Sequence, residues 1–138
     1  PPVFDAPAVH ADEVETLPPD AIVTVTNDYS AVQAAEIRHD GGVFWGVQYH
    51  PEYSFLDIVG VLERYRPILH AEKLIADDAA LDSLLADLRA LHADPGRRDL
   101  AWRYGLDAQV TDPQLRRTDL RNWIEHRVIP TAAARGHG

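Results

Sequence analysis

The hydrophobic pattern of the sequence changes once, near residue 53, and this change constrains the fold more than any other feature. Before it, short β-branched and aromatic runs alternate with turn residues, which is typical of strands. After it, apolar residues recur at every third or fourth position, which is typical of amphipathic helices. We therefore expect an α/β chain with the strands first and a helical tail.

The first part of the chain contains four strand candidates. Three of them cover residues 3–9 (interrupted by Pro7), 22–26 and 32–38. A tight turn with the sequence HDGG follows at residues 39–42, and it predicts a hairpin. The fourth candidate, residues 43–49, is apolar at almost every position, which predicts a strand buried on both faces. The helices can cover one face of such a sheet, so the other face is expected to need partners outside this chain.

Capping residues and prolines predict where the helices begin and end. Ser54 can cap the first helix, which Pro67 ends or restarts. The pair Asp77-Asp78 can break the next helical stretch and cap its second piece, and Pro130 closes the last helix. The expected helices cover about residues 54–66, 68–93, a short segment that ends at 105, and 113–130.

Composition excludes several classes of function. The chain has 138 residues, which fits one domain, and a net charge of −9, which argues against binding to nucleic acid. Basic and acidic residues are interleaved in the last third, as on a solvated helical face. No apolar run approaches the ~20 residues that cross a bilayer. We therefore expect a cytoplasmic protein with no membrane partner.

The sequence contains no cysteine. This excludes disulfides, thiolate metal sites and a cysteine nucleophile within these residues. His10, Asp12 and Glu13 have the side chains of metal ligands, but no second cluster accompanies them with zinc-like spacing. We predict neither a metal site nor a cofactor.

The segment most informative about chemistry is residues 46–52, which read GVQYHPE. Residues two apart on an extended backbone point to the same side, so His50 and Glu52 can lie side by side where the apolar strand ends. Pro51 stiffens the chain between them. A carboxylate bound to one imidazole nitrogen fixes the tautomer and leaves the other nitrogen free as a base. The pair would supply two thirds of a nucleophile–base–orienter triad.

In its context, between an apolar strand and a capped helix, this heptad resembles the third signature of the class I glutamine amidotransferases, with the GMP-synthase-like branch nearest. The resemblance covers residues 3–66 and implies the C-terminal part of a flavodoxin-like amidotransferase fold. Residues 1–66 would be the end of the amidotransferase domain, and residues 67–138 a helical extension packed on it. It also implies that His50 is the general base and that Glu52 orients it.

The same resemblance implies a substrate loop at Val9, His10 and Ala11, whose backbone would help to hold glutamine. In the family, the nucleophile is a cysteine in an elbow upstream, which these residues lack. We therefore expect a fragment that is inactive alone. Its partners would be glutamine, a missing N-terminal half or second chain, and a synthase domain or subunit that accepts ammonia. A homo-oligomer formed through exposed strand edges is a further hypothesis.

Two alternatives to a glutamine-hydrolysing enzyme remain. The absence of cysteine favours a non-catalytic, amidotransferase-like module used for binding or regulation, whereas an intact GVQYHPE favours an enzyme. A hydrolase of the same fold that cleaves a γ-glutamyl bond, without passing ammonia on, is the other alternative.

Overall fold

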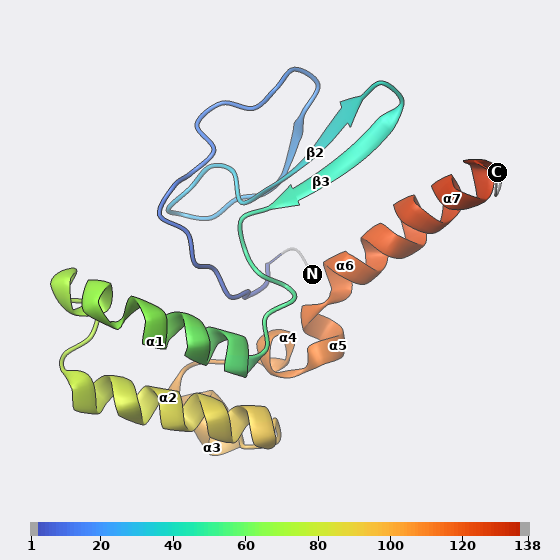
Figure 1. Ribbon diagram of the computed structural model, residues 1–138. Coiled ribbons are helices and arrows are strands. Elements are labelled where there is room, and N and C mark those ends of the chain that lie inside the picture. Colours follow the sequence, from blue (N-terminus) through green and yellow to red (C-terminus); the bar gives the residue numbers. More distant parts are fainter. Residues whose placement is uncertain (1–2, 136–138) are drawn as a thin grey trace. The chain divides into compact units, whose positions relative to one another are not determined.

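The computed structural model describes residues 3–135, and the chain forms two compact units. The helical unit contains residues Glu52–Arg116 together with the first residues up to Asp5. The sheet unit contains Ala6–Pro51 and the chain from Arg117 onward. The expected mixed α/β class, with strands before helices, is confirmed (Figure 1). The strands are β1 (Ile22–Val25), β2 (Ala34–His39) and β3 (Gly42–Val47).

This grouping differs from a division after residue 66. Where the amidotransferase part ends, and whether residues 67–138 act as an extension of it, stays a prediction. The outermost residues of those predicted segments, 1–2 and 136–138, lie outside the described residues.

The sheet is antiparallel, in the order β1-β2-β3. β2 and β3 form the predicted hairpin, and Asp40 and Gly41 connect them with φ values of 47° and 76°. Two positive φ values in a two-residue loop are the signature of a type I′ turn, whose twist matches that of the flanking strands. Between Val23 and Val25 the register of β1 shifts, so Thr24 forms a bulge.

Two strand predictions are wrong. Residues 3–9 form no strand but contribute one bridge, between Ala8 and Tyr49, because Pro7 cannot donate to a ladder. β3 is not buried on both faces: it ends the sheet, and Phe44 is 61% exposed. An apolar run does not by itself distinguish a central strand from an edge strand.

The helical unit is built on two consecutive helices that pack against each other, α1 (Phe55–Ala71) and α2 (Asp78–Ala93). As predicted, Ser54 caps α1: its hydroxyl accepts from the Asp57 N–H, and the Asp57 carboxylate accepts from the Ser54 N–H. Asp77 caps α2 in the predicted way. Three short helices follow: α3 (Arg98–Arg103), α4 (Ala108–Thr111) and α5 (Pro113–Arg116).

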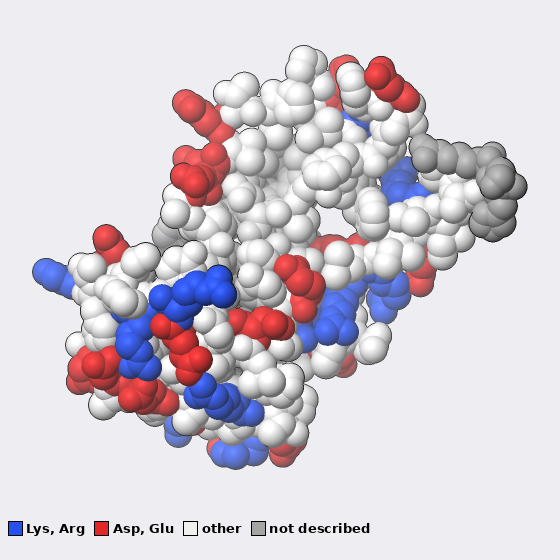
Figure 2. Space-filling view, in the orientation of Figure 1, with Lys and Arg blue, Asp and Glu red and all other residues white. Residues whose placement is uncertain are grey.

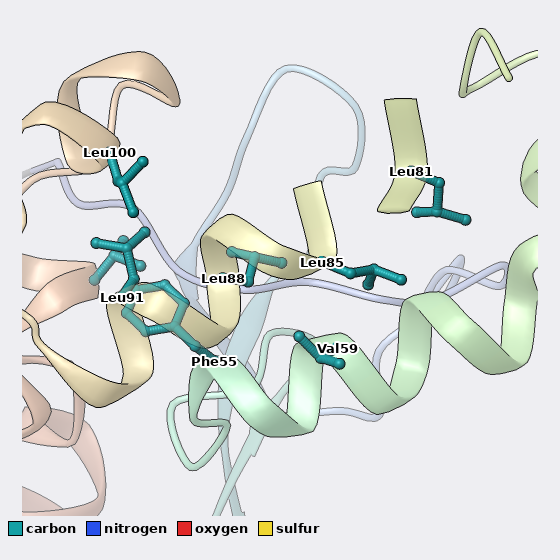
Figure 3. Packing of buried hydrophobic residues seen from close by; sticks show 8 residues of the cluster. Phe55, Val59, Leu81, Leu85, Leu88, Leu91 and Leu100 are labelled. Carbon is teal, nitrogen blue, oxygen red and sulfur yellow. The ribbon is translucent and has the colours of Figure 1, made fainter. Parts of the chain in front are cut away.

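The core of the helical unit is purely apolar (Figure 3). Phe55 and Val59 of α1 pack against one face of α2, and residues from the later helices complete the cluster. The α2 side chains in this cluster are Leu81, Leu85, Leu88 and Leu91, and the later ones are Leu100 and Val110. Ion pairs join the exposed faces of α1 and α2, and Figure 2 shows acidic and basic side chains intermingled there.

In the sheet unit, the last helical residues form α6 (Thr118–Trp123), the π-helical turn η1 (Ile124–Val128) and α7 (Ile129–Arg135). None of the helices described up to residue 135 has the length and apolar character that crossing a membrane requires.

The prolines were predicted to end helices, and both predictions are wrong. α1 continues through Pro67. Proline has no N–H to donate to the carbonyl of Glu63, one turn earlier, but Glu63 is exposed, so water can reach that carbonyl. Pro130 lies in the first turn of α7. The π-helical turn before it changes the hydrogen-bond register just where proline has no N–H to donate.

Candidate functional site

The candidate site begins at the C-terminal end of β3, where the chain leaves the hairpin. The ladder between β2 and β3 continues past the strand, since the Gln48 N–H donates to the Gln33 carbonyl at 2.8 Å. Tyr49 then forms the bridge with Ala8. The main chain is therefore held residue by residue up to His50.

His50 is half-buried, and its own N–H donates to the Pro7 carbonyl at 2.7 Å. The segment that contains Pro7 and Ala8 leads directly into the predicted substrate loop. The structure thus places Val9, His10 and Ala11 within a few residues of a backbone contact with His50. All three loop residues are exposed.

A buried side chain also attaches the predicted loop to the sheet. His10 Nδ1 lies 2.9 Å from the Asp12 carbonyl oxygen, so this nitrogen carries the proton and donates. His10 Nε2 then accepts from Gln33 Nε2 at 3.5 Å, and Gln33 is only 3% exposed. The loop is therefore fixed beside the same residue that pairs with Gln48.

Glu52 lies in the turn between β3 and α1 and is exposed. The boundary between the two compact units falls just before it, between Pro51 and Glu52. The pairing of Glu52 with His50, and the catalytic roles of both, stay predictions.

Tyr49 is a residue of this site that the sequence reasoning did not single out. Its side chain is buried, at 6% exposure, and its phenol donates to Asp119 Oδ2 at 2.7 Å. Burial, and next the hydrogen bond to Asp119, raises the pKa of Tyr49 well above its ordinary value. The phenol therefore stays protonated and serves as a donor, not as an acid or base.

A second unpredicted cluster surrounds Glu36 in β2, which is 8% exposed. Its carboxylate accepts from Arg38 and from Trp45 Nε1, each at 2.7 Å, and from Arg127 of η1 at 3.0 Å. The Arg127 guanidinium also stacks over the Trp45 ring, 5.6 Å from its centroid. The hydrogen bond from Arg38, followed by that from Trp45, lowers the pKa of Glu36.

A surface groove of about 650 Å³ lies at the other end of β3, away from His50. The hairpin turn lines one side, and residues of η1 and α7 line the other. It contains none of the predicted site residues. Among residues 3–135, no group of three or more His, Asp and Glu side chains is arranged to hold a metal ion.

Comparison with known proteins points to one family. The family model "Glutamine amidotransferase class-I" matches residues 1–56, which include GVQYHPE and the predicted substrate loop. The chain is similar to a gamma-glutamyl-L-1-hydroxyisopropylamide hydrolase from Pseudomonas sp., with 33% identity over 137 residues. That match covers 94% of the chain and 43% of the hydrolase.

The chain is also similar to one component of the glutamine-hydrolyzing GMP synthase of Methanopyrus kandleri. The identity is 40% over 50 residues, which are 36% of the chain and 26% of that synthase component. The chain therefore spans less than half of the length of either relative. No solved structure gave a significant match.

Proposed function

We propose that His50 is the general base in the hydrolysis of a γ-glutamyl amide, because the class I glutamine amidotransferase family model matches residues 1–56. The observation that carries this proposal is the GVQYHPE heptad, which lies within the family match. Its main chain is hydrogen-bonded at His50. A half-buried imidazole on a fixed backbone is suited to repeated proton transfer in one geometry.

The proposed reaction has two steps. A cysteine thiol gives its proton to His50 and attacks the γ-carbonyl carbon, and His50 returns that proton to the departing amine or ammonia. His50 next takes a proton from water, which cleaves the thioester and releases glutamate and the thiol. With glutamine, the sum is glutamine plus water giving glutamate plus ammonia. Glu52 would orient the imidazole and stabilise its protonated form.

The thiol must come from outside these 138 residues, since they contain no cysteine. In this proposal the chain supplies the base, the orienting carboxylate and part of the substrate site. Backbone groups of Val9, His10 and Ala11 would bind the glutamyl group. Their attachment beside His50, through Pro7 and Gln33, supports that assignment. A synthase domain or subunit would receive the ammonia.

A second candidate function is hydrolysis of a substituted γ-glutamyl amide with release of the amine to solvent. It is favoured by the extent of the two matches. The hydrolase match covers 94% of the chain and so includes most of the helices, whereas the GMP synthase component matches over only 50 residues. If these helices are a feature shared with the hydrolase, the leaving group of this chain's reaction would be an alkylamine rather than ammonia.

The first test determines which protein to assay. An intact mass of the product of the whole gene is compared with the 15.4 kDa of these residues. A larger mass leaves room for the nucleophile, and that product is assayed. A mass of 15.4 kDa requires a separate cysteine-bearing chain, and without one the catalytic proposal is abandoned for a non-catalytic module.

The second test measures glutamate release from glutamine and from γ-glutamyl alkylamides. We expect His50→Ala to lower kcat by about 10²- to 10⁴-fold, the usual contribution of a general base. Glu52→Gln should lower it less. His39→Ala is the matched control, since His39 is exposed at the hairpin turn.

Full activity in His50→Ala would refute the proposed role. A kcat/KM that is higher for alkylamides than for glutamine would select the hydrolase over the amidotransferase.

A further inference from the structure

The bond between Tyr49 and Asp119 connects the residue before His50 to a part of the chain that lies outside the family match. Asp119 is in α6, 70 residues beyond Tyr49, and the match ends at residue 56. Both residues belong to the sheet unit. The family signature therefore does not account for this contact.

The main chain on both sides of Tyr49 is already fixed. Gln48 donates to Gln33, Tyr49 pairs with Ala8, and His50 donates to Pro7. These contacts hold the path of the backbone, and the bond from the His50 N–H also holds the plane of the Tyr49–His50 peptide. The Tyr49 side chain, buried and bonded at its far end, adds an attachment off the strand axis, and this attachment opposes the opening of those backbone bonds.

The chemistry of the contact is that of a fixed donor–acceptor pair. A buried phenol without a partner is costly, and a carboxylate is the strongest acceptor that a side chain offers. Since its pKa is raised, the Tyr49 phenol keeps its proton and the bond persists at neutral and mildly alkaline pH.

The same helical stretch has a second attachment to β3. Arg127, in the turn that follows α6, bonds Glu36 and stacks on Trp45, four residues before Tyr49. α6 and η1 are therefore held to the hairpin at two points, so Asp119 is presented on a support that is itself fixed. α6 and η1 are thus attached both to β3 and to the segment after it, which contains His50.

We propose that Asp119 is a positioning residue for His50. Asp119 acts through the Tyr49 phenol to keep the Tyr49–His50 main chain in its hydrogen-bonded position. The proposal rests on the proposed function of His50 as a general base. It assigns a role to the C-terminal helices, which would set the direction of the imidazole without touching substrate.

The first experiment measures amide hydrogen exchange at His50 by NMR in the 138-residue chain. Tyr49→Phe removes only the hydroxyl, and Asp119→Ala removes the acceptor. Each should speed exchange at His50 by about tenfold, the order expected when a bond to a charged group is lost. Asp119→Asn keeps an acceptor oxygen and should give an intermediate rate. Exchange at Leu85, in the helical unit, should not change.

The matched control is Glu125→Gln, which makes the same acid-to-amide change at an exposed position on the same helical stretch. It should leave His50 exchange unchanged. An unchanged rate in Tyr49→Phe and Asp119→Ala would overturn the proposal. So would an equal acceleration throughout β2 and β3, which would make Asp119 a stability residue only.

The second experiment uses the product of the whole gene with the substrate it hydrolyses. Asp119→Ala should lower kcat about tenfold and leave KM unchanged, because a misdirected base affects the chemical step and not binding. An unchanged kcat would overturn the positioning role. If the wild-type protein hydrolyses neither substrate, the proposed function fails, while the exchange rates still decide whether Asp119 orients His50.

Discussion

The helical unit and the sheet unit are stabilised by different kinds of interaction. In the helical unit, Leu81 and Leu91 are 0% exposed and Leu85 is 2% exposed, within a cluster that contains no polar residue. The buried residues of the sheet unit include Ser30, Gln33 and Glu36. Its C-terminal helices are attached by a phenol–carboxylate bond and by an ion pair. The first unit should therefore respond most to lost volume, and the second to lost charge and to pH.

The largest effect is expected from a cavity in the helical unit. Leu85→Ala should lower the free energy of unfolding by about 2–5 kcal/mol, as buried Leu-to-Ala changes do. Chemical denaturation followed by circular dichroism measures this loss. Leu74→Ala is the control, since Leu74 is 70% exposed, and it should change stability little. Equal losses in the two variants would contradict the assignment of the core.

An intermediate, pH-dependent effect is expected at Glu36. Because hydrogen bonds from Arg38 and then from Trp45 lower its pKa in the folded state, its contribution is full above the ordinary glutamate pKa of 4.5 and is lost as pH falls through the lower folded value. Glu36→Gln should therefore lower the melting temperature at about pH 7, and the difference from wild type should shrink as pH falls below 4.5.

Other carboxylates titrate in the same range, so the wild-type curve alone does not isolate Glu36. Glu125→Gln supplies the reference, since it removes an exposed acid from the sheet unit and should track wild type at each pH. If the melting-temperature difference between Glu36→Gln and wild type stays constant from about pH 7 to well below 4.5, the Glu36 cluster does not respond to pH as predicted.

The smallest effect is expected at the start of α1. Ser54→Ala removes the hydroxyl that accepts from the Asp57 N–H and should cost about 1 kcal/mol. Ser83→Ala, at an exposed position inside α2, is the matched control and should be neutral or slightly stabilising. A loss at Ser54 as large as that at Leu85 would mean that capping, not apolar burial, dominates the helical unit.

Local signals in the sequence predicted much of the secondary structure. The positive φ values at Asp40 and Gly41 follow from turn chemistry, and the caps at Ser54 and Asp77 follow from side chains that bond nearby backbone. The two prolines misled the prediction of helix ends. The free-energy cost of a proline in a helix depends on whether water can reach the unpaired carbonyl, as near Pro67. It also depends on a change in the hydrogen-bond register of the helix, as before Pro130. Composition reveals neither.

Contacts between distant residues were not predictable in this way. His50 and the loop at His10 were singled out from the sequence, and the structure fixes them to neighbouring backbone. Asp119 and Arg127 were interpreted as charges on a solvated face, because nothing near them in the sequence indicates Tyr49 or Glu36 as partners. The one available signal was Glu36 itself, an acid between the apolar residues Ala35 and Ile37 of a strand, which requires a cation or donor nearby if it is buried.

The path of the chain through the two units has a consequence for biosynthesis. The sheet unit is interrupted by the helical unit, since its strands precede residue 52 and its helices follow residue 116. During translation, β2 and β3 leave the ribosome before the helices of the helical unit, whereas Arg127 and Asp119, the partners of Glu36 and Tyr49, leave after them. The helical unit has mostly local contacts and can fold in that interval. The hairpin that precedes His50 would thus be made before the helices of the helical unit and completed after them.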